Sequence, residues 1–379
     1  MKKTVCMISC CHSLLDDRIY KKEALTLARE GYSVVHVGYG ESFKGFRDFY
    51  SDDGIRLIEV KRSKVEKLFF SALFRAAKSV AADVYHLHDV ELCRMALKLK
   101  KLPHRPKVIY DAHEPYDVFL KDSWKTRSKL RLFFNDIPAV MAEKRILNKV
   151  DYLIATEENV ADHFREKNLH TAIIYNYSYF SPDDFPLNTE NKTFDLIYCG
   201  SLSETKGIFL MLNALAEAKK RGFIYRMVLV GSFHSPVIQT KIEQIIQKEN
   251  LSEQLLFTGE ISFEEVYRYY QQSKVAFCLF SSNRTNRLIL PIKLFEYAAF
   301  GLPIIGSNFG HIEEIIQSNH IGVCVNPQDA NETASALIDL LSEEKYTSYI
   351  SRCRDCVKTN YLWENQEEKL LSVYKQLLK

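Results

Sequence analysis

Residues 194–232 read FDLIYCGSLSETKGIFLMLNALAEAKKRGFIYRMVLVGS and contain one complete strand–helix–strand unit. The apolar run FDLIYC predicts a buried strand, GIFLMLNALAEAKKRG predicts a helix that ends at a glycine, and RMVLVGS predicts a second strand. Strands that alternate with helices pair in parallel, in a sheet that is covered on both faces. This stretch therefore predicts an α/β domain of the doubly wound kind.

The same alternation runs along nearly all of the 379 residues, a length that suits two domains. It lapses once, over residues 179–193, where Pro, Asn, Asp and Ser predict a linker. We therefore expect a first domain over 1–178 and a second over 194–358. Residues 359–379 predict an amphipathic helix that is surplus to the second domain, so its apolar stripe must be buried elsewhere.

Composition narrows the class of protein. The chain is 46% hydrophobic and 26% charged with a net charge of +3, which is ordinary for a globular protein. The first half is rich in Lys and Arg and the second half is slightly acidic, which suggests different partners for the two domains. We interpret residues 3–9 as a first strand and not as a leader, since charged residues follow at Asp16–Arg18. We therefore expect a cytoplasmic protein with free cysteines.

A second stretch, PIKLFEYAAFGLPIIG at 291–306, places one carboxylate in an apolar helix. Pro291 suits the first helical position, and Gly301 suits the position just past the end. Glu296 lies between them and needs a partner if it is buried. Lys293, three residues earlier, is one candidate. The hydroxyl groups of a ligand are the other.

The stretches YCGSLSETKGIFLMLNAL at 198–215 and PIKLFEYAAFGLPIIGSNFGHIEEII at 291–316 together resemble the second domain of GT-B glycosyltransferases, specifically glycosyltransferase family 4. In the first domain, DDRIYKKEALTLAREGYSV at 16–34 and the strand ends HLHD and YDAHE look like the same group. The resemblance implies two Rossmann-like doubly wound domains that face each other across a cleft, with the C-terminal helix crossing back to the N-terminal domain. It also implies a retaining glycosyltransferase of cell-surface polysaccharide or glycolipid assembly that uses a nucleotide-diphosphate sugar and needs no metal or other cofactor.

The resemblance assigns donor-binding roles in the second domain. Glu296 would accept hydrogen bonds from the ribose, and Lys206 would neutralise the diphosphate, whose negative charge grows as the glycosidic bond breaks. Gly200 and Gly231 would let backbone N–H groups approach phosphate. The other donor-side candidates are Ser201, Arg287, Lys293 and Leu294.

Two positions depart from the family pattern. A second Glu often stands where this chain has Leu288, and an Arg often follows the glycine where this chain has Ser201. Arg284, Arg287 or Lys293 would then supply the missing positive charge. The alternative is that catalysis is weak or lost, as in a non-catalytic glycosyltransferase-like subunit.

In the first domain, His113 of YDAHE matches the family histidine that faces the donor sugar near the reacting carbon, and we expect it to be catalytic. Asp16, Arg18, His88 and Glu114 are candidates on the acceptor side. We expect no metal ligands. No general base stands out, which suits a front-side mechanism in which the leaving phosphate takes the acceptor proton.

Segments 59–80 and 121–149 interleave Lys and Arg with Phe, Trp and Leu. They predict either ordinary helices whose apolar stripes face the core or helices that lie on an anionic membrane surface. No recognition motif supports nucleic acid. The resemblance implies a saccharide or lipid-linked acceptor, and with it a location in the cytoplasm or peripherally on the inner face of the membrane. Another GT-B enzyme, such as a nucleotide-sugar epimerase, stays an alternative.

Overall fold

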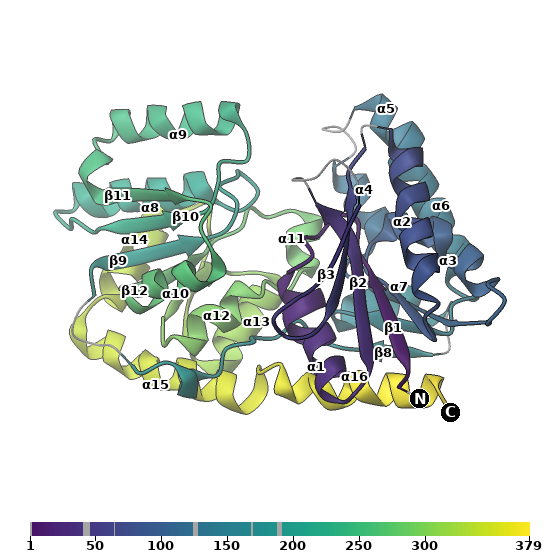
Figure 1. The fold of residues 1–379 in the computed structure, drawn as a ribbon. Coiled ribbons are helices and arrows are strands. Elements are labelled where there is room, and N and C mark those ends of the chain that lie inside the picture. The colour runs from purple at the N-terminus through teal and green to yellow at the C-terminus, as the bar shows by residue number, and fades with distance from the viewer. Residues whose placement is uncertain (1, 41–45, 64, 124–127, 168–169, 188–191) are drawn as a thin grey trace. The chain divides into compact units, whose positions relative to one another are not determined.

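The computed structural model describes residues 2–40, 46–63, 65–123, 128–167, 170–187 and 192–379. The chain divides into two compact units, each with its own sheet (Figure 1). Unit 1 comprises Met1–Tyr179 and Trp363–Lys379, and unit 2 comprises Phe180–Leu362. Among the described residues, no helix is both long and apolar enough to cross a membrane.

Unit 1 is built on an eight-stranded sheet of order β3-β4-β2-β1-β5-β6-β7-β8. Every pairing is parallel except that of β3 with β4. The antiparallel edge differs from the simple alternation expected from the sequence, because a short turn after β3 leaves no room for the crossover that parallel pairing needs. The strands are β1 Thr4–Ile8, β2 Ser33–Gly40, β3 Phe46–Tyr50, β4 Arg56–Lys61, β5 Val84–Leu87, β6 Lys107–Ala112, β7 Tyr152–Ala155 and β8 Thr171–Ile173.

Helices cover both faces of this sheet. One core cluster includes residues of α2, α3, α6 and α7, and another includes residues of η1, α1 and α16. The C-terminal helix α16 (Glu364–Leu377) belongs to unit 1, where Leu370, Val373 and Tyr374 are buried beside strand residues such as Val5 and Ile109. The other helical elements are η1 Asp17–Ala24, α1 Leu25–Arg29, α2 Glu66–Val80, η2 Val90–Leu92, α3 Cys93–Lys100, α4 Tyr116–Ser123, α5 Lys129–Arg131, η4 Leu132–Asp136, α6 Ile137–Ile146 and α7 Glu158–Arg165.

Unit 2 has a parallel six-stranded sheet of order β11-β10-β9-β12-β13-β14, which is the doubly wound order of dinucleotide-binding domains. The strands are β9 Phe194–Cys199, β10 Met227–Val230, β11 Leu255–Gly259, β12 Ser273–Cys278, β13 Ile304–Ser307 and β14 Gly322–Val325. The helical elements are η5 Pro182–Asp184, α8 Ile208–Lys220, α9 Pro236–Lys248, η6 Ser252–Gln254, α10 Phe263–Gln271, α11 Arg284–Leu288, α12 Lys293–Ala299, α13 Gly310–Asn319, α14 Ala330–Leu340 and α15 Glu343–Asn360.

Two local features differ from the sequence-based expectation. Part of the expected linker is packed within unit 2. The ring centres of Phe180 and Phe185 lie 4.4 and 5.6 Å from the ring centre of Tyr267. Helix α12 begins at Lys293 and not at Pro291, because the Pro291 carbonyl accepts a turn hydrogen bond from the Leu294 N–H at 3.1 Å. Gly301, with φ +71°, follows the helix as predicted.

Candidate functional site

The candidate donor site lies where the strand order of unit 2 reverses, between β9 and β12. Ligands of open α/β sheets bind at such a point, at the carboxyl ends of the strands. Gly200 follows β9 directly, and Phe280 follows β12. The candidates Lys206 and Lys293 both lie near these two strand ends.

The two glycines are required by close packing. Gly200 and Gly231 have φ angles of +136° and +134°. A Cβ atom at Gly231 would lie 2.2 Å from the Gly200 carbonyl oxygen, and one at Gly200 would lie 2.8 Å from Lys293 Nζ. The Gly200 N–H donates to the Val230 carbonyl at 2.8 Å, and the Gly231 N–H donates to the Gly259 carbonyl at 3.0 Å. Both glycines are therefore needed for this close approach of the backbone at the strand ends.

Two ammonium groups approach the same aromatic ring. Lys206 Nζ lies 4.3 Å from the centre of the Phe280 ring, and Lys293 Nζ lies 5.6 Å from it. Lys293 also donates to the Cys199 carbonyl at 2.7 Å. Burial alone would lower the pKa of Lys293, but the neighbouring Tyr198, Cys278 and Cys199 side chains raise it above its usual value. The carboxyl end of β9 thus carries a charged lysine in addition to Lys206.

Glu296 and Lys293 have different described partners. The Glu296 carboxylate, half-buried on α12, accepts a hydrogen bond from the Tyr270 hydroxyl at 3.0 Å. Lys293 contacts the strand end instead. The Tyr270 ring is fully buried, so its hydroxyl holds the carboxylate in one orientation. The described contacts of Glu296 therefore include Tyr270 and do not include Lys293.

The remaining donor-side candidates are placed differently. Leu294 is fully buried and belongs to the core, so its side chain cannot touch a donor as expected. Arg287 is exposed at the end of α11, with its guanidinium 4.9 Å from the Phe309 ring centre and a 2.8 Å bond to Ser282 Oγ. Ser201 and Arg284 are exposed. Of the three residues proposed to replace the missing arginine, Lys293 alone has a described contact at the end of β9.

Unit 1 has its own reversal of strand order, between β1 and β5. A cavity of about 380 Å³ opens beyond these strands, and His88, His113 and Glu114, which the sequence analysis singled out, are among its lining residues. Asp16 and Arg18 are not among its lining residues. The other lining residues are Cys11, His12, Asp89, Val90, Glu91, Tyr110, Tyr116 and Arg131.

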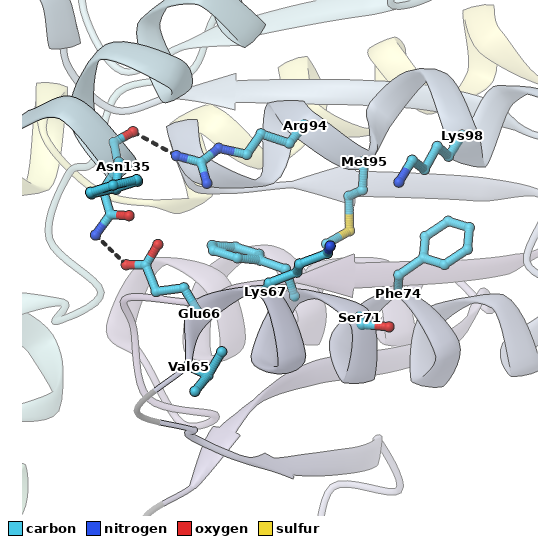
Figure 2. A pocket seen from close by; sticks show the side chains of 11 residues that line it. Val65, Glu66, Lys67, Ser71, Phe74, Arg94, Met95, Lys98 and Asn135 are labelled. Carbon is cyan, nitrogen blue, oxygen red and sulfur yellow. Dashed lines mark hydrogen bonds between the residues drawn. The ribbon is translucent and has the colours of Figure 1, made fainter. Parts of the chain in front are cut away.

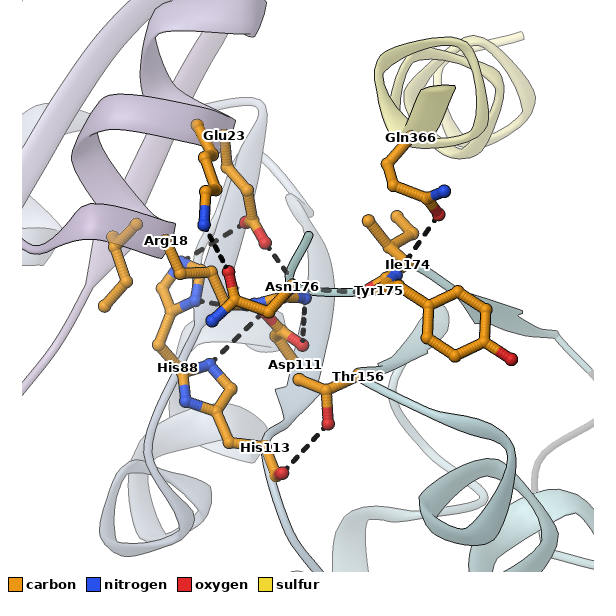
Figure 3. Close-up of polar contacts among 12 residues, drawn as sticks. Arg18, Glu23, His88, Asp111, His113, Thr156, Ile174, Tyr175, Asn176 and Gln366 are labelled. Carbon is orange, nitrogen blue, oxygen red and sulfur yellow. Dashed lines mark hydrogen bonds and ion pairs between the residues drawn. The ribbon is translucent and has the colours of Figure 1, made fainter. Parts of the chain in front are cut away.

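Asp16 and Arg18, which do not line this cavity, have structural contacts within unit 1. Asp16 caps η1, a π-helical turn, by accepting from the N–H groups of Arg18 and Ile19 at 2.9 and 3.0 Å. Arg18 is buried and pairs with Asp111 through its Nε and Nη2 atoms at 2.9 and 3.1 Å (Figure 3). Its Nη2 also lies 3.1 Å from Glu23 Oε1. Sequence reasoning could not show that this exposed-looking arginine is enclosed.

Asp111 is the residue that joins these groups to His113, and sequence reasoning missed it. Asp111 Oδ2 lies 3.4 Å from His113 Nε2 and 3.3 Å from His88 Nδ1. Burial alone would raise the pKa of Asp111, but the Arg18 guanidinium holds it well below its usual value. A signal was present, because residues two apart on a strand share a face, and Asp111 stands two before His113.

His12 and Asp89 form a second missed pair. His12 Nδ1 lies 3.0 Å from Asp89 Oδ1, and the His12 ring centre lies 5.2 Å from that of His113. Burial alone would lower the pKa of His12, but the hydrogen bond and charge of Asp89 raise it to about 9. Asp89 Oδ2 also accepts from the N–H groups of Cys10 and Cys11 at 2.5 and 3.1 Å. The Asp89 carboxylate therefore favours the protonated form of His12 beside His113.

Two family models match the chain. The model described as Glycosyltransferase Family 4 matches residues 22–177, and the model described as Glycosyl transferases group 1 matches residues 181–361.

Curated relatives are distant. The chain is 26% identical over 190 residues to spore coat protein SA of Bacillus subtilis (strain 168), a match that covers 48% of each protein. It is 24% identical over 284 residues to the amylovoran biosynthesis glycosyltransferase AmsK of Erwinia amylovora, which covers 73% of this chain and 66% of that protein. The chain thus spans about half the length of the first of these relatives.

Solved structures agree in fold. The sucrose-phosphate synthase of Thermosynechococcus elongatus superposes with a TM-score of 0.76 at 20% identity, covering 100% of this chain and 99% of that one. Anabaena HepE in complex with UDP and glucose superposes with a TM-score of 0.75 at 12% identity, covering 99% and 100%. At these identities the likeness concerns the fold.

Proposed function

The chain belongs to glycosyltransferase family 4 and has the GT-B fold, and from this premise we propose that it is a retaining glycosyltransferase. It moves a sugar from a nucleotide-diphosphate sugar to a saccharide or lipid-linked acceptor, in cell-surface polysaccharide or glycolipid assembly. The observation that carries the proposal is the arrangement at the end of β9. There, Lys206 and Lys293 approach one ring, and Tyr270 orients the carboxylate of Glu296.

This arrangement suits the two charged parts of such a donor. A diphosphate leaving group gains negative charge as the glycosidic bond breaks, and two ammonium groups stabilise that charge more in the transition state than in the ground state. A ribose offers hydroxyl donors, and an oriented carboxylate accepts from them with charge-assisted strength. The Lys293 ammonium supplies the positive charge that other family members obtain from an arginine at the position of Ser201.

His113 acts from unit 1. Its side chain is partly exposed to the unit 1 cavity, and the Asp111 carboxylate orients its imidazole for catalysis. The acceptor binds in the same cavity. No general base is assigned, so the leaving phosphate takes the acceptor proton, and catalysis rests on positioning and electrostatics. We propose that transfer needs no metal ion.

The relatives support the setting of this reaction. AmsK is named for amylovoran biosynthesis, and HepE was solved with UDP and glucose. We therefore propose polysaccharide assembly as the setting and a nucleotide sugar as the donor. We further propose that the protein acts in the cytoplasm and associates peripherally with an anionic membrane surface, without nucleic acid as a partner.

The test is product analysis with a panel of nucleotide sugars. We expect slow hydrolysis of one donor in the absence of acceptor, and a loss of at least 100-fold in His113→Ala. A nucleotide sugar with inverted stereochemistry as the product would instead identify an epimerase. Absence of turnover with every donor, or turnover that His113→Ala leaves unchanged, would contradict the proposal and favour a non-catalytic subunit.

A further inference from the structure

A groove of about 660 Å³ lies in unit 1, outside the cavity that contains His113. It is lined by side chains of α2, α3 and η4, so it joins the two basic and aromatic segments of the sequence. Figure 2 shows Met95 and Lys98 reaching from one helix toward the helix that contains Ser71 and Phe74, while Arg94 extends toward Asn135. Its volume is within the range of about 300–1,000 Å³ typical of small-molecule sites.

The walls of the groove are apolar, and its charges are mostly positive. Phe70, Phe74, Met95 and Phe134 supply the apolar surface. Lys67, Arg94 and Lys98 supply three positive charges, and Glu66, which accepts from Asn135 Nδ2 at 2.5 Å, is the negative group among the lining residues. The groove is thus suited to a ligand that is apolar along its length and anionic at one point.

Arg94 has one polar atom without a hydrogen-bond partner among the described residues. Its Nη2 donates to the Asn135 carbonyl at 2.5 Å, but its Nε is buried without a hydrogen-bond partner among the described residues. A buried N–H without an acceptor is costly, so an acceptor on a bound ligand would offset that cost. A phosphate oxygen is the acceptor that a guanidinium binds most strongly.

Apolar side chains beside the groove are exposed. Val65 and Phe134, which line it, have 55% and 63% of their surface exposed, and their neighbours Leu68 and Phe133 have 61% and 69% exposed. Exposed apolar side chains gathered in this way mark an interaction surface. Together with the cations they match a lipid surface with anionic head groups.

We propose that this groove binds one acyl chain of an anionic phospholipid from the membrane surface, with the lipid phosphate at Arg94 and Lys98. The inference deepens the membrane partner proposed above and rests on it. A hydrocarbon chain places no polar group against the aromatic walls. A peptide would bury backbone N–H and C=O groups there, and those walls offer them no partners.

Ser71→Trp tests the groove by filling it. Ser71 is exposed on α2 and lines the groove, whereas Ser79 is exposed on the same helix and is not among the lining residues, so Ser79→Trp is the matched control. We expect the unmodified protein to bind phosphatidylcholine vesicles that contain phosphatidylglycerol at least ten times more tightly than phosphatidylcholine alone. Ser71→Trp should lose most of this preference, and Ser79→Trp should keep it. Arg94→Gln combined with Lys98→Gln should also lose it.

A fluorescent reporter tests occupancy by the chain itself. In Phe74→Trp, phosphatidylglycerol with brominated acyl chains should quench the fluorescence of the new tryptophan. This quenching should exceed that of the native tryptophans, which is measured in the unmodified protein. Equal affinity for both vesicle types, a full preference in Ser71→Trp, or no added quenching in Phe74→Trp would overturn the inference. Donor hydrolysis without vesicles is measured in parallel, so a failed transferase with intact lipid binding would refute only the enzymatic proposal.

Discussion

Asp111 and His113 stand two residues apart at the end of β6, and a carboxylate oxygen of Asp111 lies 3.4 Å from His113 Nε2. The same carboxylate pairs with the buried guanidinium of Arg18. The orientation of the expected catalytic histidine therefore depends on an ion pair whose other member comes from the first helical segment. Figure 3 shows His88, His113 and Arg18 gathered around Asp111.

Asp111→Asn should therefore be costly for both stability and activity. The change leaves Arg18 with less compensating charge in a buried site, and breaking a buried pair in this way costs about 3–5 kcal/mol. Urea unfolding measures the stability, and donor hydrolysis measures the activity. Combined with Arg18→Met, the loss of stability should be clearly smaller than the sum of the single losses. Additive losses would show that the two residues do not depend on each other.

Lys293→Ala should weaken donor binding at least tenfold, because it removes the ammonium group next to Gly200. If Lys293 replaces the family arginine, Ser201→Arg added to Lys293→Ala should recover part of the affinity. Titration calorimetry with the identified donor measures both effects. Arg287→Ala is the control, since its guanidinium lies on Phe309, and it should change affinity less than threefold. Unchanged donor affinity in Lys293→Ala would refute the proposal that Lys293 replaces the family arginine.

The His12–Asp89 pair should make stability depend on pH at both ends of the range. The pKa of His12 is raised from 6.5 to about 9, so its stabilising contribution is complete below about pH 6.5 and is lost as the pH rises through about 9. Burial alone would raise the pKa of Asp89, but His12 lowers it below its usual value. The contribution of Asp89 to stability is therefore lost only as the pH falls toward that lowered pKa.

Urea midpoints between pH 6 and pH 10 measure the alkaline limb of this profile. We expect His12→Asn to flatten the decline between pH 7 and pH 9.5. His234, exposed on unit 2, is the control, and His234→Asn should leave the decline unchanged. The same slope in both variants would contradict the pairing of His12 with Asp89.

Removal of α16 should destabilise unit 1 selectively. Trp363 Nε1 donates to Thr26 Oγ1 at 2.9 Å, and the Tyr374 hydroxyl lies 2.9 Å from His86 Nδ1. Truncation after Leu362 exposes the apolar face of the sheet that these residues cover. Hydrogen exchange should then show lost protection in β1, β5, β6 and β7. Protection lost only within Phe180–Leu362 would show that the helix stabilises the other unit.

Helices and strands could be predicted from the sequence more completely than side-chain contacts. Apolar periodicity predicted the strand–helix–strand order of residues 194–232, which the structure shows as β9, α8 and β10. Fold class and family were likewise confirmed. The antiparallel β3 was missed because edge strands are short and weakly patterned.

The site was predicted less completely, for physical reasons. Arg18 and Asp111 are 93 residues apart, and nothing in either local pattern shows that they are paired and buried. The same holds for His12 and Asp89. Leu294 was named among the donor-side candidates, but its side chain is fully buried in the core. Residues 124–127, within the basic segment for which a membrane surface was one of two alternatives, lie outside the described residues. Arg131 of that segment lines the cavity that contains His113.

The central claim is that Glu296, oriented by Tyr270, binds the ribose of a nucleotide-sugar donor, and a thermal-shift titration of the unmodified protein and Glu296→Gln tests it most directly. At 100 times its Kd, a donor should stabilise the unmodified protein by about 2.7 kcal/mol. Glu296→Gln should unfold at nearly the same temperature without ligand, because the amide keeps the volume of the carboxylate, and should bind the donor at least tenfold more weakly. No shift with any nucleotide sugar, or equal affinity in the two proteins, would contradict the account.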